Sequence, residues 1–125
     1  MSLTLELSLV QAHVSEPLVK LAIKNNDTDS SYLLIEPTPY QSPVRFVIVR
    51  QHDNTIMPYC GALAKIRYDE RMLDSHETMF YTLSLQPYML EANQVYHVVA
   101  HYRHPYSPSI PGFESNTIQV VLSTQ

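Results

Sequence analysis

The chain has 125 residues, of which 45% are hydrophobic and 16% are charged, and we expect one globular domain over residues 1–125. Its net charge of -4 argues against nucleic acid as a partner, because surfaces that bind phosphates carry clustered positive charge. With one cysteine it cannot form an internal disulfide, and no apolar run approaches the roughly 20 residues of a membrane-spanning helix.

Alternating hydrophobic residues predict two strands in the first quarter of the sequence. Every second residue from Leu3 to Leu9 is leucine, and polar residues lie between them, as in a strand with one buried face. The same alternation returns over residues 19–24 and ends at the turn-forming residues 25–27. We expect these two strands to pair or to lie side by side.

The middle of the chain predicts a further strand, a hairpin and a loop. Residues 32–35 are bulky and apolar and precede Pro37, which indicates a central strand with a rigid exit. Residues 44–50 are rich in β-branched side chains, and a polar turn joins them to a second hairpin strand at residues 55–59. Residues 65–77 are crowded with charges, so we expect an exposed loop there, with at most one helical turn.

Three later segments complete the predicted set of strands, at residues 78–85, 94–104 and 117–122. Tyr96 lies near the start of the second of these. That position predicts a tyrosine corner, in which the phenol bonds back to upstream backbone. Strands at this spacing predict an all-β fold, an immunoglobulin-like Greek-key β-sandwich of about seven to eight antiparallel strands.

The sequence offers no convincing catalytic or cofactor site. Its two glycines cannot build a phosphate-binding loop. His97, His101 and His104 have a spacing that would suit zinc on a helix, but on a strand residues four apart are separated by roughly 13 Å. We therefore expect no metal, no cofactor and no enzymatic activity. Cys60 is interpreted as an inert thiol, buried or half-buried.

Nine tyrosines and nine prolines are the more suggestive feature. Tyr40, Tyr102 and Tyr106 lie in or beside proline-rich turns, where they either cap the open ends of the core or present a binding surface on stiff loops. Tyr102 and Tyr106 could also stack on a carbohydrate, although the absence of tryptophan weakens that alternative.

Short motifs from about residue 3 to residue 122 carry a resemblance to a known family. The motifs share an order along the chain, and they are the Leu-x-Leu start of the first strand, Lys20 to Asn25, Pro37-Thr38-Pro39, Tyr59-Cys60-Gly61, Lys65-Ile66-Arg67 and Tyr96-His97-Val98. In this order they resemble the N-terminal β-sandwich propeptide domain of bacterial deuterolysin-type (aspzincin) zinc metalloendopeptidases. The family's usual Pro-Gly turn before the late strands is absent, and the sequence holds no H-E-x-x-H, so it is not the protease itself.

The resemblance implies a non-catalytic module that covers a protease active site or assists folding, such as a free-standing inhibitor with a zinc metalloendopeptidase as its protein partner. The family motifs and the proline-rich turns together give the candidate residues for this contact. They are Thr38, Pro39, Tyr40, Tyr59, Gly61, Tyr102 and Tyr106. The alternatives are that the motifs only fix turns, and that the sandwich is an adaptor for an unrelated protein. Residues 1–9 show no basic leader or apolar segment, so we expect a cytoplasmic chain, or a periplasmic or secreted one if a signal peptide was removed.

Overall fold

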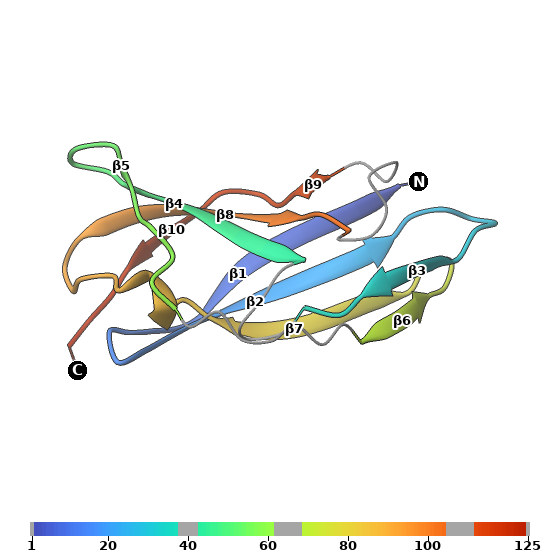
Figure 1. The fold of residues 1–125 in the computed structure, drawn as a ribbon, viewed down its shortest axis with the longest axis horizontal. Coiled ribbons are helices and arrows are strands. Elements are labelled where there is room, and N and C mark those ends of the chain that lie inside the picture. The colour runs from blue at the N-terminus through green and yellow to red at the C-terminus, as the bar shows by residue number, and fades with distance from the viewer. Residues whose placement is uncertain (1, 38–42, 62–68, 105–111, 125) are drawn as a thin grey trace.

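The fold is all-β, with ten strands and one short 3-10 helix in a computed structural model that describes residues 2–37, 43–61, 69–104 and 112–124 (Figure 1). The elements are, in chain order, β1 (Leu3–His13), β2 (Glu16–Asn25), β3 (Tyr32–Ile35), β4 (Val44–Arg50), β5 (Thr55–Ile56), β6 (Glu70–Leu73), β7 (Thr78–Ser84), η1 (Gln86–Tyr88), β8 (Val95–Tyr102), β9 (Phe113–Glu114) and β10 (Ile118–Val121).

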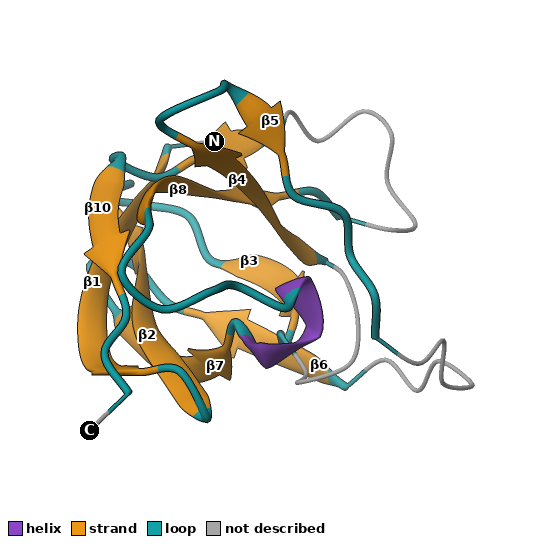
Figure 2. Cartoon of the chain, turned by 90° about the vertical axis from the view of Figure 1, so that its left-hand side faces the viewer, coloured by secondary structure: helices purple, strands orange, loops and turns teal. Residues whose placement is uncertain are grey.

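Two antiparallel sheets form the immunoglobulin-like sandwich that the sequence predicts. The three-stranded sheet has the order β1-β2-β7, and the five-stranded sheet has the order β10-β8-β4-β5 with β9 paired to β8. The chain crosses between the sheets from β2 to β4, from β5 to β7 and from β7 to β8, so neighbours in space are often distant in sequence. Figure 2 shows the two layers from one end.

The core lies between the sheets and is built by the period-two alternation of the strands. On β8 the even-numbered residues are buried and the odd-numbered residues are half-exposed. Tyr96 is completely buried, and its hydroxyl oxygen accepts a hydrogen bond from the backbone N–H of Glu91 at 2.9 Å. This contact confirms the predicted tyrosine corner.

The edges of β1 and β10 are joined by a seam that contains few backbone ladder bonds. Isolated parallel bridges connect Leu5 with Ser115 and His13 with Ser123. Between them the side chain of Asn116 bonds both backbone groups of Leu7: its Oδ1 accepts from the N–H at 2.7 Å and its Nδ2 donates to the C=O at 3.0 Å. The amide therefore takes the place of a strand partner.

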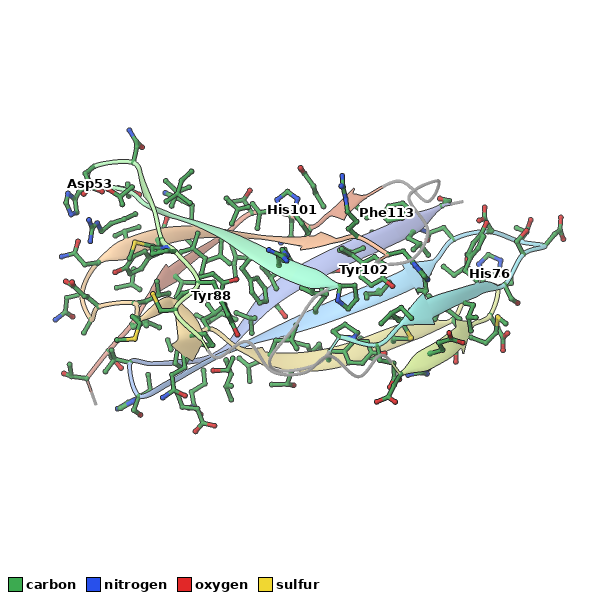
Figure 3. The ribbon with its side chains drawn as sticks, viewed as in Figure 1. Asp53, His76, Tyr88, His101, Tyr102 and Phe113 are labelled. Carbon is green, nitrogen blue, oxygen red and sulfur yellow. The ribbon has the colours of Figure 1, made fainter. Side chains whose placement is uncertain are left out.

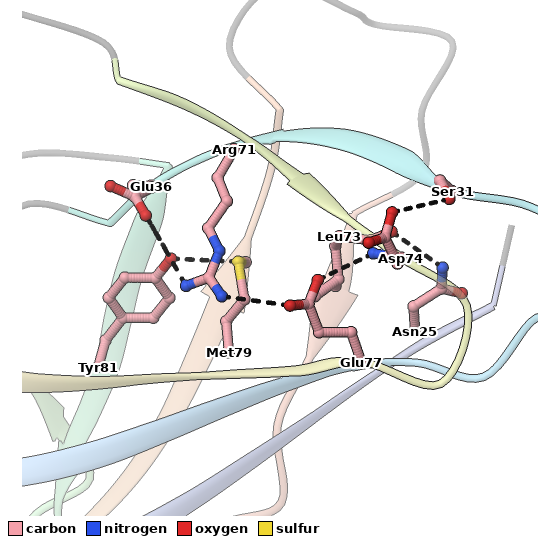
Figure 4. A network of polar contacts seen from close by, with 9 residues as sticks. All are labelled: Asn25, Ser31, Glu36, Arg71, Leu73, Asp74, Glu77, Met79 and Tyr81. Atoms are coloured by element: carbon pink, nitrogen blue, oxygen red, sulfur yellow. Dashed lines mark hydrogen bonds and ion pairs between the residues drawn. The ribbon is translucent and has the colours of Figure 1, made fainter.

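On the opposite side, β3 and β6 form a two-stranded ribbon. Figure 4 shows how polar side chains attach this ribbon to β7. Arg71 Nη2 lies 3.5 Å from Glu77 Oε2, and the Tyr81 hydroxyl donates to Glu36 Oε1 at 3.3 Å. At the end of the ribbon, Asn25 Nδ2 donates to the C=O of Leu73 at 3.2 Å.

The structure confirms the β1–β2 pairing and the β4–β5 hairpin, and it corrects three details. Residues 70–73 form β6 and not a loop, because their backbone pairs with β3 in spite of their charges. That pairing also places residues 32–35 in the ribbon and not at the centre of a main sheet. The second hairpin strand ends at Ile56, before Pro58. The ten strands exceed the predicted seven or eight because of these short elements.

Candidate functional site

The outer surface of the five-stranded sheet carries a group of aliphatic side chains that the core does not use. We call this group the valine face, and it consists of Val47, Val49, Ile56, Val95, Val99 and Val121. Ile56, Val121 and Val47 are 66%, 42% and 39% exposed, and the other three are half-exposed. Isolated exposed apolar residues are ordinary on a protein surface. These six indicate a binding surface only if they lie next to one another.

Strand register makes the valine face contiguous. Val47 lies opposite Val99 across the β4–β8 ladder, and Val49 lies opposite Ile56 across the β4–β5 ladder. Val95 lies opposite Val121 across the β8–β10 ladder. Side chains directly opposite in antiparallel strands have Cβ atoms roughly 5 Å apart and touch. The six residues therefore lie in three successive rows across four strands, and the middle row also contains His97.

Polar side chains lie within and beside the face. His97 lies between Val95 and Val99 on β8, opposite Val49, and is hydrogen-bonded through Nε2 to Gln51 Oε1 at 2.9 Å. At the end near β9, His101 Nδ1 lies 3.5 Å from Glu114 Oε1. The face therefore combines aliphatic and polar groups, as the contact surfaces of proteins commonly do.

The β4–β5 turn holds Ile56 in position. Arg50 makes two hydrogen bonds to the Asp53 carboxylate, at 3.1 and 2.8 Å, and the N–H of Thr55 donates to the same carboxylate at 3.1 Å. These contacts, the arginine first, hold the pKa of Asp53 well below its usual value. The Asp53 carboxylate thus joins the end of β4 to the N–H of Thr55, the residue before Ile56.

The outer surface of the three-stranded sheet differs in character. Its outward positions carry threonine, serine, glutamate and lysine, apart from Ala22 and Phe80 near its centre and a few apolar residues at the hairpin end. Phe80 is 59% exposed, and the Lys20 ammonium lies 5.0 Å from its ring centre, so this aromatic face is partly covered by a cation. Of the two sheet surfaces, the five-stranded one is the apolar one.

The residues that the sequence predicts for partner binding do not gather at one described place. Thr38, Pro39, Tyr40 and Tyr106 lie outside the described residues, as do residues 65–67 of the family motif. Tyr59 and Gly61 are described, on the segment that follows β5.

Tyr59 and Gly61 form a compact contact with η1. The Tyr59 ring is 39% exposed and packs edge-on against Tyr88, with ring centres 5.6 Å apart. A Cβ added to Gly61 would lie 2.4 Å from the Tyr59 hydroxyl oxygen and 2.9 Å from the Cβ of Pro87, so only glycine leaves the ring in this position. The N–H of Cys60 donates to the C=O of Pro87 at 2.7 Å. Tyr59 thus has one packed side and one side open to a partner.

Tyr102 is a core residue, and the prediction that it contacts a partner is wrong. Its side chain is completely buried, and Figure 3 shows it projecting to the side of β8 opposite His101. The hydroxyl accepts from the N–H of Ile35 at 3.0 Å and donates to its C=O at 3.2 Å. Burial follows from the even position on β8. It also removes Tyr102 from any stack on a carbohydrate.

The histidines and the cysteine take ordinary positions. His97 and His101 share the outer surface of the sheet, while His104 is 9% exposed. Within the described part of the chain, no three His, Cys, Asp or Glu side chains form a group suited to a metal ion. Cys60 is exposed, contrary to the expected burial, because the segment after β5 runs over the surface.

The sequence analysis missed the valine face although the signal was present. The odd positions of residues 95–101 read as the solvent side of a strand, yet two of them are valine. An apolar residue on the second face of a strand could have pointed to this surface, but only the sheet order brings Val47, Ile56 and Val121 beside them.

No family model matches the sequence, and no curated protein matches it significantly. In the described residues there is no helix long and apolar enough to cross a bilayer.

Proposed function

We propose that this chain is a non-catalytic protein-binding module that uses the valine face as its contact surface. The observation that carries the proposal is the contrast between the two sheets: one outer surface is polar, and the other presents six aliphatic side chains in adjacent rows. Burial of such a surface removes apolar area from water and stabilises a complex by about 25 cal/mol per Å² before the costs of association.

The backbone geometry supports a rigid mode of binding. The valine face lies on β4, β5, β8 and β10, which are held by continuous ladders, so its shape does not depend on loops. A surface that is already ordered loses little conformational entropy when it binds.

The sequence resemblance supplies one class of partner. A propeptide-like module would bind a deuterolysin-type zinc metalloendopeptidase and act as an inhibitor or folding partner. An adaptor role with an unrelated protein uses the same surface and differs only in the partner. The carbohydrate alternative loses support, because Tyr102 is buried.

The first experiment is a titration of the purified chain into a deuterolysin-type protease, followed by peptide cleavage and by isothermal calorimetry. The propeptide-like proposal predicts saturable inhibition with one chain per protease. Val47→Lys should weaken this binding by roughly tenfold or more, because a lysine at the centre of the contact would have to leave water without a partner.

Val10→Lys is the matched control, because it makes the same substitution at an exposed bulge position of β1, on the other sheet. Both variants should unfold within about 0.5 kcal/mol of the parent chain, since both sites face solvent. If the protease is not inhibited, capture experiments should compare the two variants: a partner retained by Val10→Lys and lost with Val47→Lys identifies an adaptor. Equal binding by all three chains to every partner tested would refute the valine face as the contact.

A further inference from the structure

Strand β7 is the outermost strand of the three-stranded sheet, and none of the described strands pairs with its second edge. This edge does not belong to the valine face, which lies on the other sheet. The inference drawn from it is therefore independent of the function proposed above.

Two hydrogen bonds show which backbone groups point to the free edge. The N–H of Asn25 donates to the C=O of Glu77 at 3.0 Å, and the N–H of Leu85 donates to the C=O of Pro17 at 2.9 Å. Backbone groups of successive residues point to alternate edges of a strand, so the odd-numbered residues of β7 pair with β2. The N–H and C=O groups of Thr78, Phe80 and Thr82 consequently point away from the sheet.

The free edge lacks the usual protection against pairing. Natural edge strands are blunted by charged side chains, proline, bulges or short length. Residues 78–85 contain no charged residue and no proline, the strand has seven residues, and its pairing with β2 has no register shift. Two lysines of β2 lie beside these residues: Lys20 lies over the Phe80 ring, and Lys24 lies opposite Thr78.

Strand β6 precedes β7 by one tight turn, yet it does not occupy this edge. It pairs with β3 instead, and Figure 4 shows the Arg71 and Tyr81 side chains between the ribbon and β7. Tyr81 is an odd-numbered residue on the inner side of the sheet, so the Arg71 contacts lie on the core side. The outward side of β7, with the exposed Phe80 and Thr82, is not part of this network.

Three outward residues of β7 are symmetric about Phe80. Reading along the strand they are Thr78, Phe80 and Thr82, so their order is the same in both directions, and Ser84 follows them at the end of the strand. When two such strands meet antiparallel about a twofold axis at Phe80, Phe80 faces Phe80, and each Thr78 faces the other Thr82. Aromatic pairs and Thr–Thr pairs are both favourable across strands.

We propose that a second copy of this chain pairs with β7, edge to edge, and forms a twofold dimer with one continuous sheet of the order β1-β2-β7-β7-β2-β1. Each of the three facing pairs then exchanges two backbone hydrogen bonds, since their N–H and C=O groups all point to the free edge. The antiparallel arrangement places the two β6–β7 turns at opposite ends of the joined strand pair. Both valine faces stay available.

Sedimentation equilibrium over about 10 µM to 1 mM measures the association, because an interface of one strand pair is small and reversible. The parent chain should shift from monomer to dimer across this range. Phe80→Lys and Phe80→Glu should each remain monomeric, since each places like charges opposite one another at the axis. An equimolar mixture of the two variants should regain the dimer, because residue 80 of one chain faces residue 80 of the other.

Hydrogen exchange followed by NMR gives a second readout at residue resolution. The amides of Phe80 and Thr82 should exchange quickly at low concentration and become protected as the concentration rises, while those of Met79 and Tyr81 stay protected throughout. Ile56→Lys is the control on the other sheet and should dimerise like the parent chain. This control separates the two proposals, because it should weaken the contact with a protease or adaptor without affecting the dimer.

A parent chain that stays monomeric to 1 mM would overturn the proposal. So would a Phe80→Lys chain that dimerises like the parent, or protection of the Phe80 and Thr82 amides that does not change with concentration, since the edge would then be covered within one chain.

Discussion

Three of the six described tyrosines use their hydroxyl group to bond the backbone. The hydroxyl of Tyr96 accepts from the N–H of Glu91, that of Tyr88 accepts from the N–H of Phe46 at 3.2 Å, and that of Tyr102 bonds both groups of Ile35. A phenol on a buried ring can reach backbone groups at strand edges that no ladder satisfies. These three tyrosines thus have structural roles, whereas the candidate contact residue Tyr59 is 39% exposed.

Replacing Tyr96 with phenylalanine tests how much the tyrosine corner contributes to the free energy of unfolding. The change leaves the ring in the core and removes only the acceptor of the partly buried Glu91 N–H. We expect a fall of about 1 to 2 kcal/mol in the free energy of unfolding, measured by urea denaturation. Thr117→Val, which removes an exposed hydroxyl, should change stability by less than about 0.5 kcal/mol. Equal stability of parent and Tyr96→Phe would show that water replaces the phenol.

The sequence predicts the structural role of Tyr96 correctly and that of Tyr102 wrongly. The reason is that the two phenols bond backbone at very different distances along the chain. A tyrosine corner has a local signature, because the phenol bonds backbone five residues upstream. Tyr102 bonds Ile35, 67 residues away, and only the placement of β3 against β8 reveals it. Its neighbours in sequence are proline-rich, which suggested a loop. Strand alternation from Tyr96 to Tyr102 was the better guide, since it places both on the buried side.

At the scale of elements, the sandwich is held along one side by a side chain in place of a ladder. Asn116 bonds the N–H and C=O of Leu7 between two isolated bridges, and 109 residues separate the two positions. No period or turn signal marks such a contact in a sequence. By contrast, the long strands β1, β2, β4, β7 and β8 could be predicted, because alternation of buried and exposed residues extends over most of each one.

Asn116→Ala should weaken the β1–β10 seam. Two hydrogen bonds are lost and two partly buried backbone groups are left to find water, so we expect a loss of about 2 kcal/mol in the free energy of unfolding. The Leu7 amide should exchange faster in the variant, and this local readout distinguishes an opened seam from general destabilisation. Gln119→Ala, an exposed change on β10, is the control and should leave the Leu7 amide protected. An unchanged hydrogen-exchange rate of the Leu7 amide would show that the isolated β-bridges hold the seam without Asn116.

The β3–β6 ribbon shows why charge-rich segments are hard to assign. Glu70 and Arg71 suggest a solvated loop, but Leu73 is completely buried and anchors the segment beside β7. Arg71 then pairs with Glu77 and lies 4.0 Å from Glu36, so its charge is compensated at the surface. The ribbon exists because these long-range contacts outweigh weak local strand preference.

Considered as a whole molecule, the two outer surfaces and the free edge of β7 can act separately. The valine face belongs to the five-stranded sheet, and the free edge belongs to the three-stranded sheet. A dimer through β7 would present two valine faces on one particle, and a partner with two sites would then bind with higher avidity than a single copy allows. The sequence predicted the architecture, but the sheet order was needed to locate both surfaces.

Two buried phenols make the stability of the whole molecule depend on alkaline pH. Burial raises the pKa of Tyr102 to about 12, and burial, with a contribution from the Glu36 charge, raises the pKa of Tyr81 to about 12 as well. In the unfolded chain both phenols titrate near 10. The unfolded state therefore releases these protons first, and stability that is complete below pH 10 is lost as the pH rises from 10 towards 12.

Urea denaturation at pH 8 to 12 measures this loss, and tyrosinate absorbance near 295 nm measures the ionisation itself. The parent chain should show a declining free energy of unfolding above pH 10, together with phenols that ionise only when the protein unfolds. Tyr102→Phe should be less stable at neutral pH but should decline less steeply, because one phenol with a raised pKa is gone. Tyr81→Phe should reduce the slope as well, and by less, since that phenol is only half-buried and is partly screened by water. A slope that is the same in all three chains would show that neither phenol is held protonated by the fold.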